Sequence, residues 1–179
     1  MEKALTSEKI VILDFGSQYT QLIARRIREA GVYSEILPHE TSLKKIKELK
    51  ASGVIMSGGP ESVYSKEALK FDSNLMDSEI PILGICYGMQ SMAKHFKGKV
   101  NSSNKREFGN ATLKINKGSI FASLLPKTNE LNVWMSHGDK VSKLPKGFKK
   151  IGSSKNSPIA AFENTKLKKY GFQFHPEVT

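Results

Sequence analysis

The residues best suited to covalent chemistry surround the only cysteine of the chain. The run Gly84-Ile85-Cys86-Tyr87-Gly88 lies between an apolar segment typical of a strand and a segment typical of a helix. This is the pattern of a nucleophile elbow with cysteine in place of serine, because a tight, strained turn excludes bulky neighbours. A helix N-terminus behind the sulfur would favour the thiolate, and the N–H of Tyr87 would face an oxyanion. The competing interpretation is a structural cysteine, since short patterns recur by chance.

A cysteine nucleophile needs a base that carries its proton, and that base needs a group to orient it. His175 follows an extended apolar run, and Glu177 stands two residues later. Residues two apart in an extended segment lie on the same side, and Pro176 stiffens the link between them. The sequence therefore predicts a triad of Cys86, His175 and Glu177. The alternative is a loop histidine beside a surface carboxylate.

The run Ser57-Gly58-Gly59-Pro60 follows another expected strand. Glycines at a strand end let the backbone approach a ligand closely and leave N–H groups free to donate. The N–H groups of Gly59 and Tyr87 would then form an oxyanion hole. A phosphate-binding loop is the competing interpretation. We reject it because Pro60 has no N–H and no Walker-type lysine follows.

A third polar run, from Trp134 to Asp139, is expected to be an exposed glycine loop after a strand. Its histidine is a second candidate base, but His175 already has an orienting carboxylate. We therefore interpret the loop as a binding segment for the ammonium and carboxylate groups of an amino acid. Its candidate contacts are Ser136, His137, Gly138 and Asp139. A purely structural turn is the alternative.

Strand and helix signals alternate in the first half of the chain. Expected strands cover 10–13, 33–37, 53–56 and 81–85, and expected helices cover a stretch ended by Gly31, 42–49, 68–76 and 88–96. This order predicts an α/β fold: a mostly parallel sheet, helices on both faces and a site at the carboxyl ends of the strands. Strand-like segments lie near 111–115, 131–135, 148–153, 159–162 and 170–174. They predict an antiparallel addition in the second half, whose last strand would deliver His175.

Length and composition limit the other possibilities. The 179 residues suffice for one domain with a complete core. A formal net charge of +11 could indicate a nucleic-acid partner, but only four arginines are present, so we interpret it as a lysine-rich solvated surface. One cysteine allows neither an internal disulfide nor a thiolate cluster, and we expect no metal. The polar start and the lack of a bilayer-spanning apolar run predict a cytoplasmic protein without membrane contact.

Three segments together resemble the signatures of the class I (triad) glutamine amidotransferases: 84–90, 57–60 and 174–177. The resemblance extends over essentially the whole chain. It implies a flavodoxin-like α/β fold in which Cys86 is the nucleophile, His175 the general base and acid, and Glu177 the group that orients it. The implied reaction is hydrolysis of glutamine to glutamate and ammonia through a cysteine thioester.

The same resemblance implies further contacts around the substrate. Gly59 would donate to the oxyanion, and Gly58 and Gln90 would lie near the bound glutamine. Within the family, the segments 12–19, 106–109 and 135–139 resemble members whose ammonia is used by an ATP-dependent synthetase domain to convert XMP to GMP. This implies a synthetase partner that binds XMP, ATP and Mg, no cofactor in this domain, and a homodimeric full enzyme.

The chain ends two residues after Glu177. We therefore expect a single amidotransferase domain over 1–179 that is truncated at its C-terminus and lacks the synthetase domain. Two alternatives stay open at this point. One is the glutaminase domain of another amidotransferase, of the anthranilate synthase or carbamoyl phosphate synthetase type. The other is a non-catalytic module that senses glutamine without cleaving it.

Overall fold

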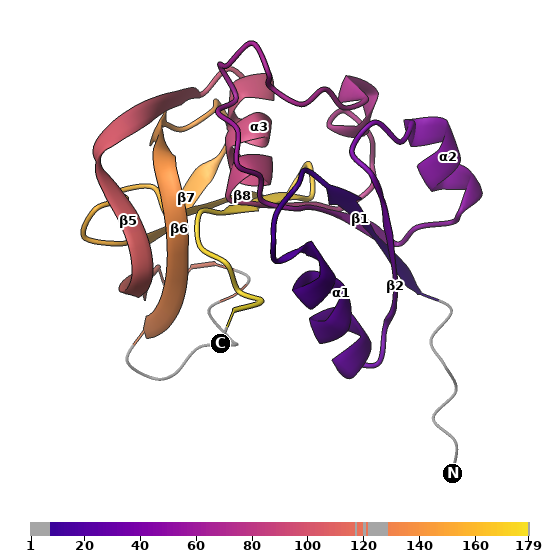
Figure 1. Ribbon diagram of the computed structural model, residues 1–179, viewed down its shortest axis with the longest axis horizontal. Helices are drawn as coiled ribbons and strands as arrows, with labels where there is room; N and C mark the ends of the chain where they lie inside the picture. The colour runs from indigo at the N-terminus through magenta and orange to yellow at the C-terminus, as the bar shows by residue number, and fades with distance from the viewer. Residues whose placement is uncertain (1–7, 117, 120, 122–128, 179) are drawn as a thin grey trace.

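The computed structural model describes residues 8–116, 118–119, 121 and 129–178, with the backbone alone for 103–106. In this part of the chain one mixed sheet has the strand order β2-β1-β3-β4-β9-β8-β7-β5-β6 (Figure 1). The strands are β1 (Lys9–Asp14), β2 (Tyr33–Pro38), β3 (Gly53–Met56), β4 (Ile82–Ile85), β5 (Lys99–Ile115), β6 (Glu130–Lys143), β7 (Lys149–Ser153), β8 (Ala161–Asn164) and β9 (Lys169–Phe172). The helices are α1 (Thr20–Glu29), α2 (Leu43–Glu48), α3 (Tyr87–His95) and the short 3₁₀ turn η1 (Ser73–Leu75).

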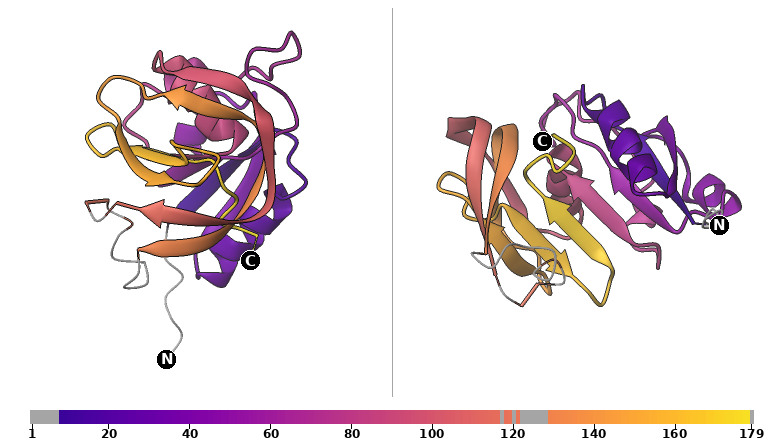
Figure 2. Two further views of the ribbon diagram at one scale, coloured as in Figure 1. Left: turned by 90° about the vertical axis from the view of Figure 1, so that its left-hand side faces the viewer. Right: turned by 90° about the horizontal axis from the view of Figure 1, so that it is seen from below.

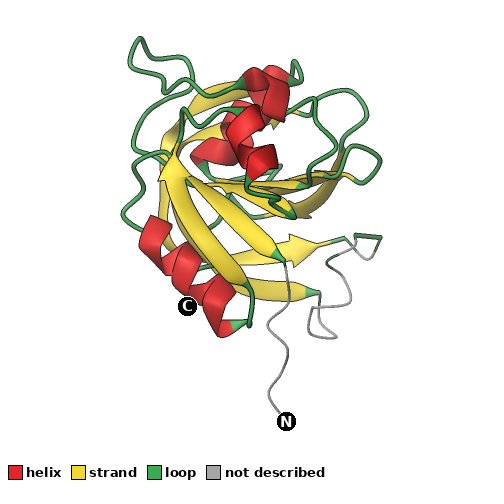
Figure 3. Ribbon diagram, turned by 90° about the vertical axis from the view of Figure 1, so that its right-hand side faces the viewer, coloured by secondary structure: helices red, strands yellow, loops and turns green. Residues whose placement is uncertain are grey.

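Different helices cover the two faces of the parallel half of the sheet (Figures 1 and 3). Successive residues of a strand point to opposite faces, and β1 shows this directly. Val11 and Leu13 are buried in one cluster with residues of α2 and α3, whereas Ile12 is buried in another with residues of α1. The expected parallel sheet with helices on both faces is therefore confirmed.

The last strand, β9, connects the two halves of the sheet. It pairs in parallel with β4 on one side and antiparallel with β8 on the other. The antiparallel addition predicted from the second half of the sequence is thus present, and its final strand also joins the parallel half through β4. Because Ile85 pairs with Phe172, and the N–H of Cys86 donates to the Phe172 carbonyl at 2.7 Å, the end of the chain is delivered beside the elbow.

Strands β5 and β6 form a long curved ribbon (Figure 2). They extend beyond the expected strands, and their pairing is irregular between Ser102 and Glu107. Ser136 pairs with Phe108 and His137 with Glu107, so residues 136–139 lie in β6. The prediction of a loop there was wrong, because the partner strand supplies the ladder that the polar local sequence does not reveal.

The helix expected over 68–76 was also wrong, since the segment contains turns and only η1. Its backbone bonds to other parts of the chain. The N–H of Leu69 donates to the Tyr87 hydroxyl at 3.0 Å, and the carbonyl of Lys70 contacts His39. Asp72 accepts the N–H of Leu43 at the start of α2 at 2.8 Å. These distant partners outweigh the local helix propensity.

Candidate active site

Cys86 stands on a sharp turn between β4 and α3. Its φ of 51° and ψ of −104° lie in a region that non-glycine residues rarely adopt, so the backbone is strained there. A Cβ on Gly84 would lie 2.5 Å from the backbone carbon of Gly88, and a Cβ on Gly88 would collide with the carbonyl oxygen of Met56. Both flanking glycines are therefore required by space, as the elbow pattern predicts.

His175 and Glu177 meet in a buried turn that follows β9. The Nδ1 atom of His175 lies 2.8 Å from Oε1 of Glu177, and both side chains are almost fully buried. The N–H of Val178 donates to the carbonyl of His175, so this segment is a turn and not the extended stretch assumed from the sequence. The backbone of His175 bonds to Trp134, which ties the turn to β6.

Gly58 shows how closely the histidine approaches the cysteine. A Cβ on Gly58 would lie 3.0 Å from Cε1 of His175 and 3.6 Å from Cβ of Cys86. The loop that carries Gly58 therefore packs against both residues at once. Because Nδ1 of His175 is taken up by Glu177, the Nε2 atom is the one left for the sulfur.

The charge of His175 follows from these neighbours. Burial disfavours the imidazolium, but hydrogen bonds with Cys86 and Glu177, together with their negative charges, outweigh burial and raise the pKa of His175 to about 9. The ring is accordingly protonated at neutral pH. It holds its positive charge between a sulfur and a carboxylate.

The loop 57–60 is held against the elbow by the side chain and backbone of Ser57. Its Oγ accepts the N–H of Phe15 at 2.9 Å, and its carbonyl accepts the N–H of Gly88 at 3.2 Å. A Cβ on Gly59 would lie 2.5 Å from the Phe15 carbonyl oxygen, so only glycine fits. In the described part of the chain, the N–H groups of Gly59 and Tyr87 donate to no protein acceptor, as an oxyanion hole requires.

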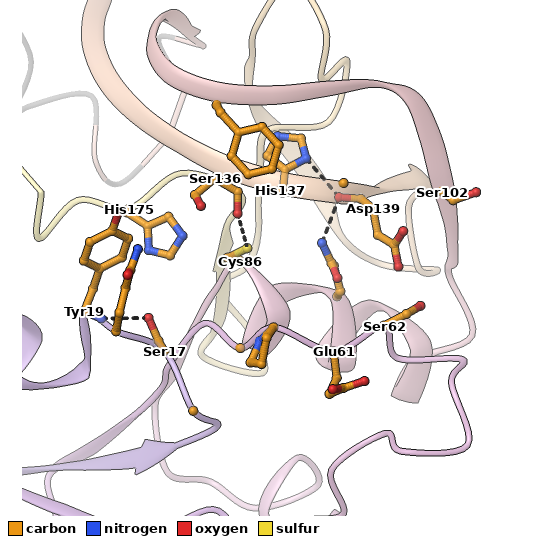
Figure 4. Close-up of a pocket in the computed structure, with 17 residues that line it drawn as sticks. Ser17, Tyr19, Glu61, Ser62, Cys86, Ser102, Ser136, His137, Asp139 and His175 are labelled. Carbon is orange, nitrogen blue, oxygen red and sulfur yellow. Dashed lines mark hydrogen bonds between the residues drawn. The ribbon is translucent and has the colours of Figure 1, made fainter.

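A cavity of about 550 Å³ opens beside the elbow (Figure 4). This volume lies within the range of small-molecule sites. Of the residues singled out from the sequence, Gly59, Cys86, Gln90, Ser136, His137, Gly138, Asp139 and His175 line it. The other three, Gly58, Tyr87 and Glu177, are not among the residues that line the cavity. The ring of Tyr87 packs into the core against Phe15, so only its backbone can serve the site.

His137 does not behave as an exposed loop residue. It is 4% exposed, and its Nδ1 lies 3.0 Å from the backbone oxygen of Asp139. Its Nε2 lies 3.2 Å from Oγ of Ser157 and 3.3 Å from Oε2 of Glu107. Burial lowers the pKa of His137, although Glu107 opposes that effect. Since protein atoms engage both ring nitrogens, its backbone is the part left to contact a substrate.

Sequence reasoning missed Gln173, which is fully buried beneath the nucleophile. Its Nε2 lies 3.6 Å from Sγ of Cys86, and its Oε1 accepts from Nε2 of Gln90 at 3.4 Å. The sequence signal that could have found it is its position two residues before His175, since residues two apart in an extended segment lie on the same side. Ser17 and Tyr19 also line the cavity.

The part of the chain that the structure describes holds no group of three or more histidine, cysteine, aspartate or glutamate side chains able to bind a metal ion. Among those same residues, no helix is both long and apolar enough to cross a membrane.

Comparisons with known proteins agree with this geometry. The family model described as Glutamine amidotransferase class-I matches residues 11–179. A curated protein of Lactobacillus gasseri named GMP synthase (glutamine-hydrolyzing) is 52% identical over 172 residues, which cover 96% of this chain and 33% of that protein. A protein of the same name from Neisseria meningitidis is 53% identical over 176 residues, 98% of this chain and 34% of that protein. The chain thus spans about a third of the length of these relatives.

Solved structures show the same fold. A GMP synthase subunit of Thermoplasma acidophilum superposes with a TM-score of 0.82 at 31% identity, covering 96% of this chain and 85% of that one. A glutamine amidotransferase of Thermotoga maritima gives a TM-score of 0.77 at 26% identity, covering 96% and 76%. With the family match over nearly the whole described chain, these likenesses confirm the flavodoxin-like fold expected from the sequence. The chain belongs to the class I glutamine amidotransferase family.

Proposed function

We propose that this chain hydrolyses glutamine to glutamate and ammonia, and that the ammonia is used to convert XMP to GMP. The observation that carries the first half is the strained Cys86 beside the buried His175–Glu177 pair, at the wall of a cavity that can hold an amino acid. The relatives named GMP synthase support the second half.

The acylation step uses the charge already present at the site. The Cys86 thiolate attacks the γ-carbonyl carbon of glutamine, and the N–H groups of Gly59 and Tyr87 stabilise the oxyanion that forms. His175, which carries a proton at neutral pH, transfers it to the amide nitrogen. The C–N bond then breaks, ammonia leaves, and a γ-glutamyl thioester and a neutral imidazole are left.

The second step reverses the role of the histidine. Neutral His175 takes a proton from a water molecule, which attacks the thioester carbonyl from the cavity. The oxyanion forms again at Gly59 and Tyr87, and its collapse breaks the C–S bond. Glutamate leaves, and the thiolate and imidazolium are restored. Glu177 holds Nδ1–H of His175 throughout, which fixes the ring and stabilises its charge.

The end of the cavity away from His175 would bind the amino-acid end of glutamine. Asp139 lies across the cavity from His175 (Figure 4), and its carboxylate would pair with the ammonium group of glutamine. Gln90 lines the same wall. The backbone N–H groups of the segment 136–138 would bind the α-carboxylate.

The synthetase reaction would take place on a separate domain that binds XMP, ATP and Mg, and this chain would need no cofactor of its own. In this proposal the full enzyme is a cytoplasmic homodimer.

The test is ammonia release from glutamine by the purified protein, alone and with a GMP synthase synthetase domain, XMP and ATP. We expect glutaminase activity that Cys86→Ser abolishes, and a γ-glutamyl adduct on Cys86 in mass spectra. An active Cys86→Ser variant, or a label elsewhere, would contradict the mechanism. Amination of another acceptor would contradict the role in GMP formation.

A further inference from the structure

A second buried histidine–carboxylate pair lies at the wall of the cavity, and no step of the proposed mechanism uses it. Glu107 of β5 and His137 of β6 face each other across the ribbon, with Oε2 and Nε2 3.3 Å apart. Their side chains are 8% and 2% exposed, respectively. Burying a carboxylate costs desolvation free energy unless hydrogen bonds compensate for the lost water, so a buried pair of this kind needs an explanation.

The hydrogen bonds around the pair fix the orientation of the His137 ring. A carbonyl oxygen only accepts, so the Nδ1 atom, 3.0 Å from the Asp139 oxygen, carries a hydrogen. At the other end of the ring, Ser154 donates to Glu107 at 3.1 Å, and Ser157 lies 3.1 Å from Glu107 and 3.2 Å from Nε2 of His137. Ser157 has one hydroxyl hydrogen, so it donates either to Glu107 or to Nε2 of His137, and the Nδ1–Asp139 hydrogen bond is the contact common to both states of the ring.

The fixed ring in turn holds a substrate-facing side chain. The backbone carbonyl oxygen of Asp139, which accepts from His137, also accepts from Nε2 of Gln90 at 2.9 Å. The same Gln90 nitrogen donates to Gln173 at 3.4 Å. With the amide nitrogen engaged by these two acceptors, the carbonyl oxygen is the part of the Gln90 amide left for a ligand, and Gln90 lines the cavity. A carbonyl oxygen at that place suits an ammonium group.

We infer that Glu107 and His137 are positioning residues: through the Asp139 carbonyl they orient the Gln90 amide and the Asp139 segment to receive the ammonium end of glutamine. This inference rests on the proposed glutaminase function and extends it. In the described part of the chain no hydrogen bond joins the pair to Cys86, His175 or Glu177, although the charge of His175 acts on His137. Loss of the pair should therefore weaken binding of the amino-acid end while leaving the reactivity of Cys86 intact.

A merely structural network would give a different result. Losing it would loosen the whole site, and every reaction of Cys86 would slow together. Two alkylating reagents separate the cases. Diazo-oxo-norleucine must occupy the glutamine subsite before it reacts, whereas iodoacetamide reports only on the exposure and charge of the thiol.

The experiment compares Glu107→Gln, His137→Leu and His137→Asn with the wild-type protein. Asparagine can place an N–H near the position of Nδ1, so it preserves the bond to Asp139. Glu163→Gln is the matched control: Glu163 is another buried carboxylate that contacts a serine hydroxyl, Ser119, at 3.4 Å, but it does not line the cavity. Melting temperatures identify any variant that has lost its fold.

We expect Glu107→Gln and His137→Leu to raise KM for glutamine and slow diazo-oxo-norleucine labelling by roughly 10-fold to 100-fold, because small displacements of bound substrate have effects of that size. The kcat and the iodoacetamide rate should change less than about 3-fold, well below that displacement effect. His137→Asn should recover most of the loss. The control should match the wild-type protein.

Two outcomes would overturn the inference: a KM change in Glu107→Gln no larger than in Glu163→Gln, or equal slowing of both reagents. A failure of the proposed function looks different, because the wild-type protein itself would then release no ammonia from glutamine.

Discussion

Two buried histidines line the same cavity, and their pKa values are shifted in opposite directions. His175 lies between a sulfur and a carboxylate, and its pKa is raised to about 9. His137 is buried among a carbonyl, a serine and one carboxylate, and burial lowers its pKa. The first can therefore deliver a proton at neutral pH, whereas the second acts through the hydrogen bond of its Nδ1. In the proposed mechanism, this difference favours His175 for the acid–base role.

The two members of the His175–Glu177 pair should differ in their effect on turnover. His175→Ala removes the proton carrier, and kcat for glutamine should fall by about 10²–10⁴-fold. Glu177→Ala leaves the imidazole in place but unoriented, so its loss should be smaller. Steady-state ammonia release measures both. If His137→Ala, and not His175→Ala, abolished thioester formation at saturating glutamine, the base would have been misassigned.

The pH dependence should follow the charge of His175. Because its pKa is raised to about 9, the proton needed by departing ammonia is present at pH 7 and is lost as the pH rises through about 9. The kcat/KM for glutamine should therefore decline above about pH 9. Glu177→Gln removes a charge that favours the imidazolium, so the decline should move to lower pH. A profile that is the same in both proteins would contradict this account.

At the scale of elements, the connection between β4 and α3 leaves no room for side chains at Gly84 and Gly88. Gly84 and Gly88 approach each other within the turn, while Gly88 also rests on β3 through Met56. The strained Cys86 backbone persists because these contacts hold it on both sides. The N-terminus of α3 and the Tyr87 N–H of the proposed oxyanion hole are thereby placed beside the sulfur.

Gly84→Ala should destabilise this unit. Its Cβ would lie 2.5 Å from the Gly88 carbon and 2.6 Å from the Met89 nitrogen, and backbone atoms cannot move aside as side chains do. The free energy of unfolding should fall by about 1–3 kcal/mol, the usual effect of overpacking. Gly53→Ala is the control, because its Cβ would lie 3.2 Å from the flexible tip of the Ile10 side chain and 3.5 Å, an ordinary contact distance, from the Pro81 carbonyl oxygen. Urea denaturation of both variants measures the difference, and equal stabilities would refute the steric argument.

At the scale of the whole molecule, the active site is assembled from distant parts of the sequence. The elbow follows β4, the oxyanion loop follows β3, and His175 comes from the segment after β9. The sheet order places these three strands side by side. The site therefore depends on the relative position of several loops.

Glutaminase activity should rise when the synthetase domain binds XMP and ATP. Ammonia released without an acceptor is wasted, and a displacement of about 1 Å between the thiolate and the oxyanion donors can reduce the rate about 10²-fold. A partner that corrects such a displacement would couple the two reactions. Turnover of the amidotransferase chain alone should be compared with that of the two-domain enzyme. Equal turnover would show that the site needs no partner to be competent.

Local sequence was sufficient for the features that depend on neighbouring residues. The elbow is visible as a pattern of five residues, from Gly84 to Gly88, and the alternation of apolar segments in the first half reports directly on strands and helices. The adjacent Gly58-Gly59 pair and the spacing of His175 and Glu177 are also visible in the local sequence, although the atom that excludes a side chain at Gly59 belongs to the distant Phe15. These features, together with the family resemblance, were enough to predict the fold class and the candidate site.

Only the tertiary structure decided which distant segments meet. The placement of β9 beside β4, the burial of His137 opposite Glu107 and the loss of the helix expected over 68–76 all depend on partners far along the chain. Local propensity differs by less than about 1 kcal/mol per residue, so long-range pairing and burial override it. Gln173 was missed for the same reason: its contacts with Gln90 and Cys86 exist only once three separate segments have packed together.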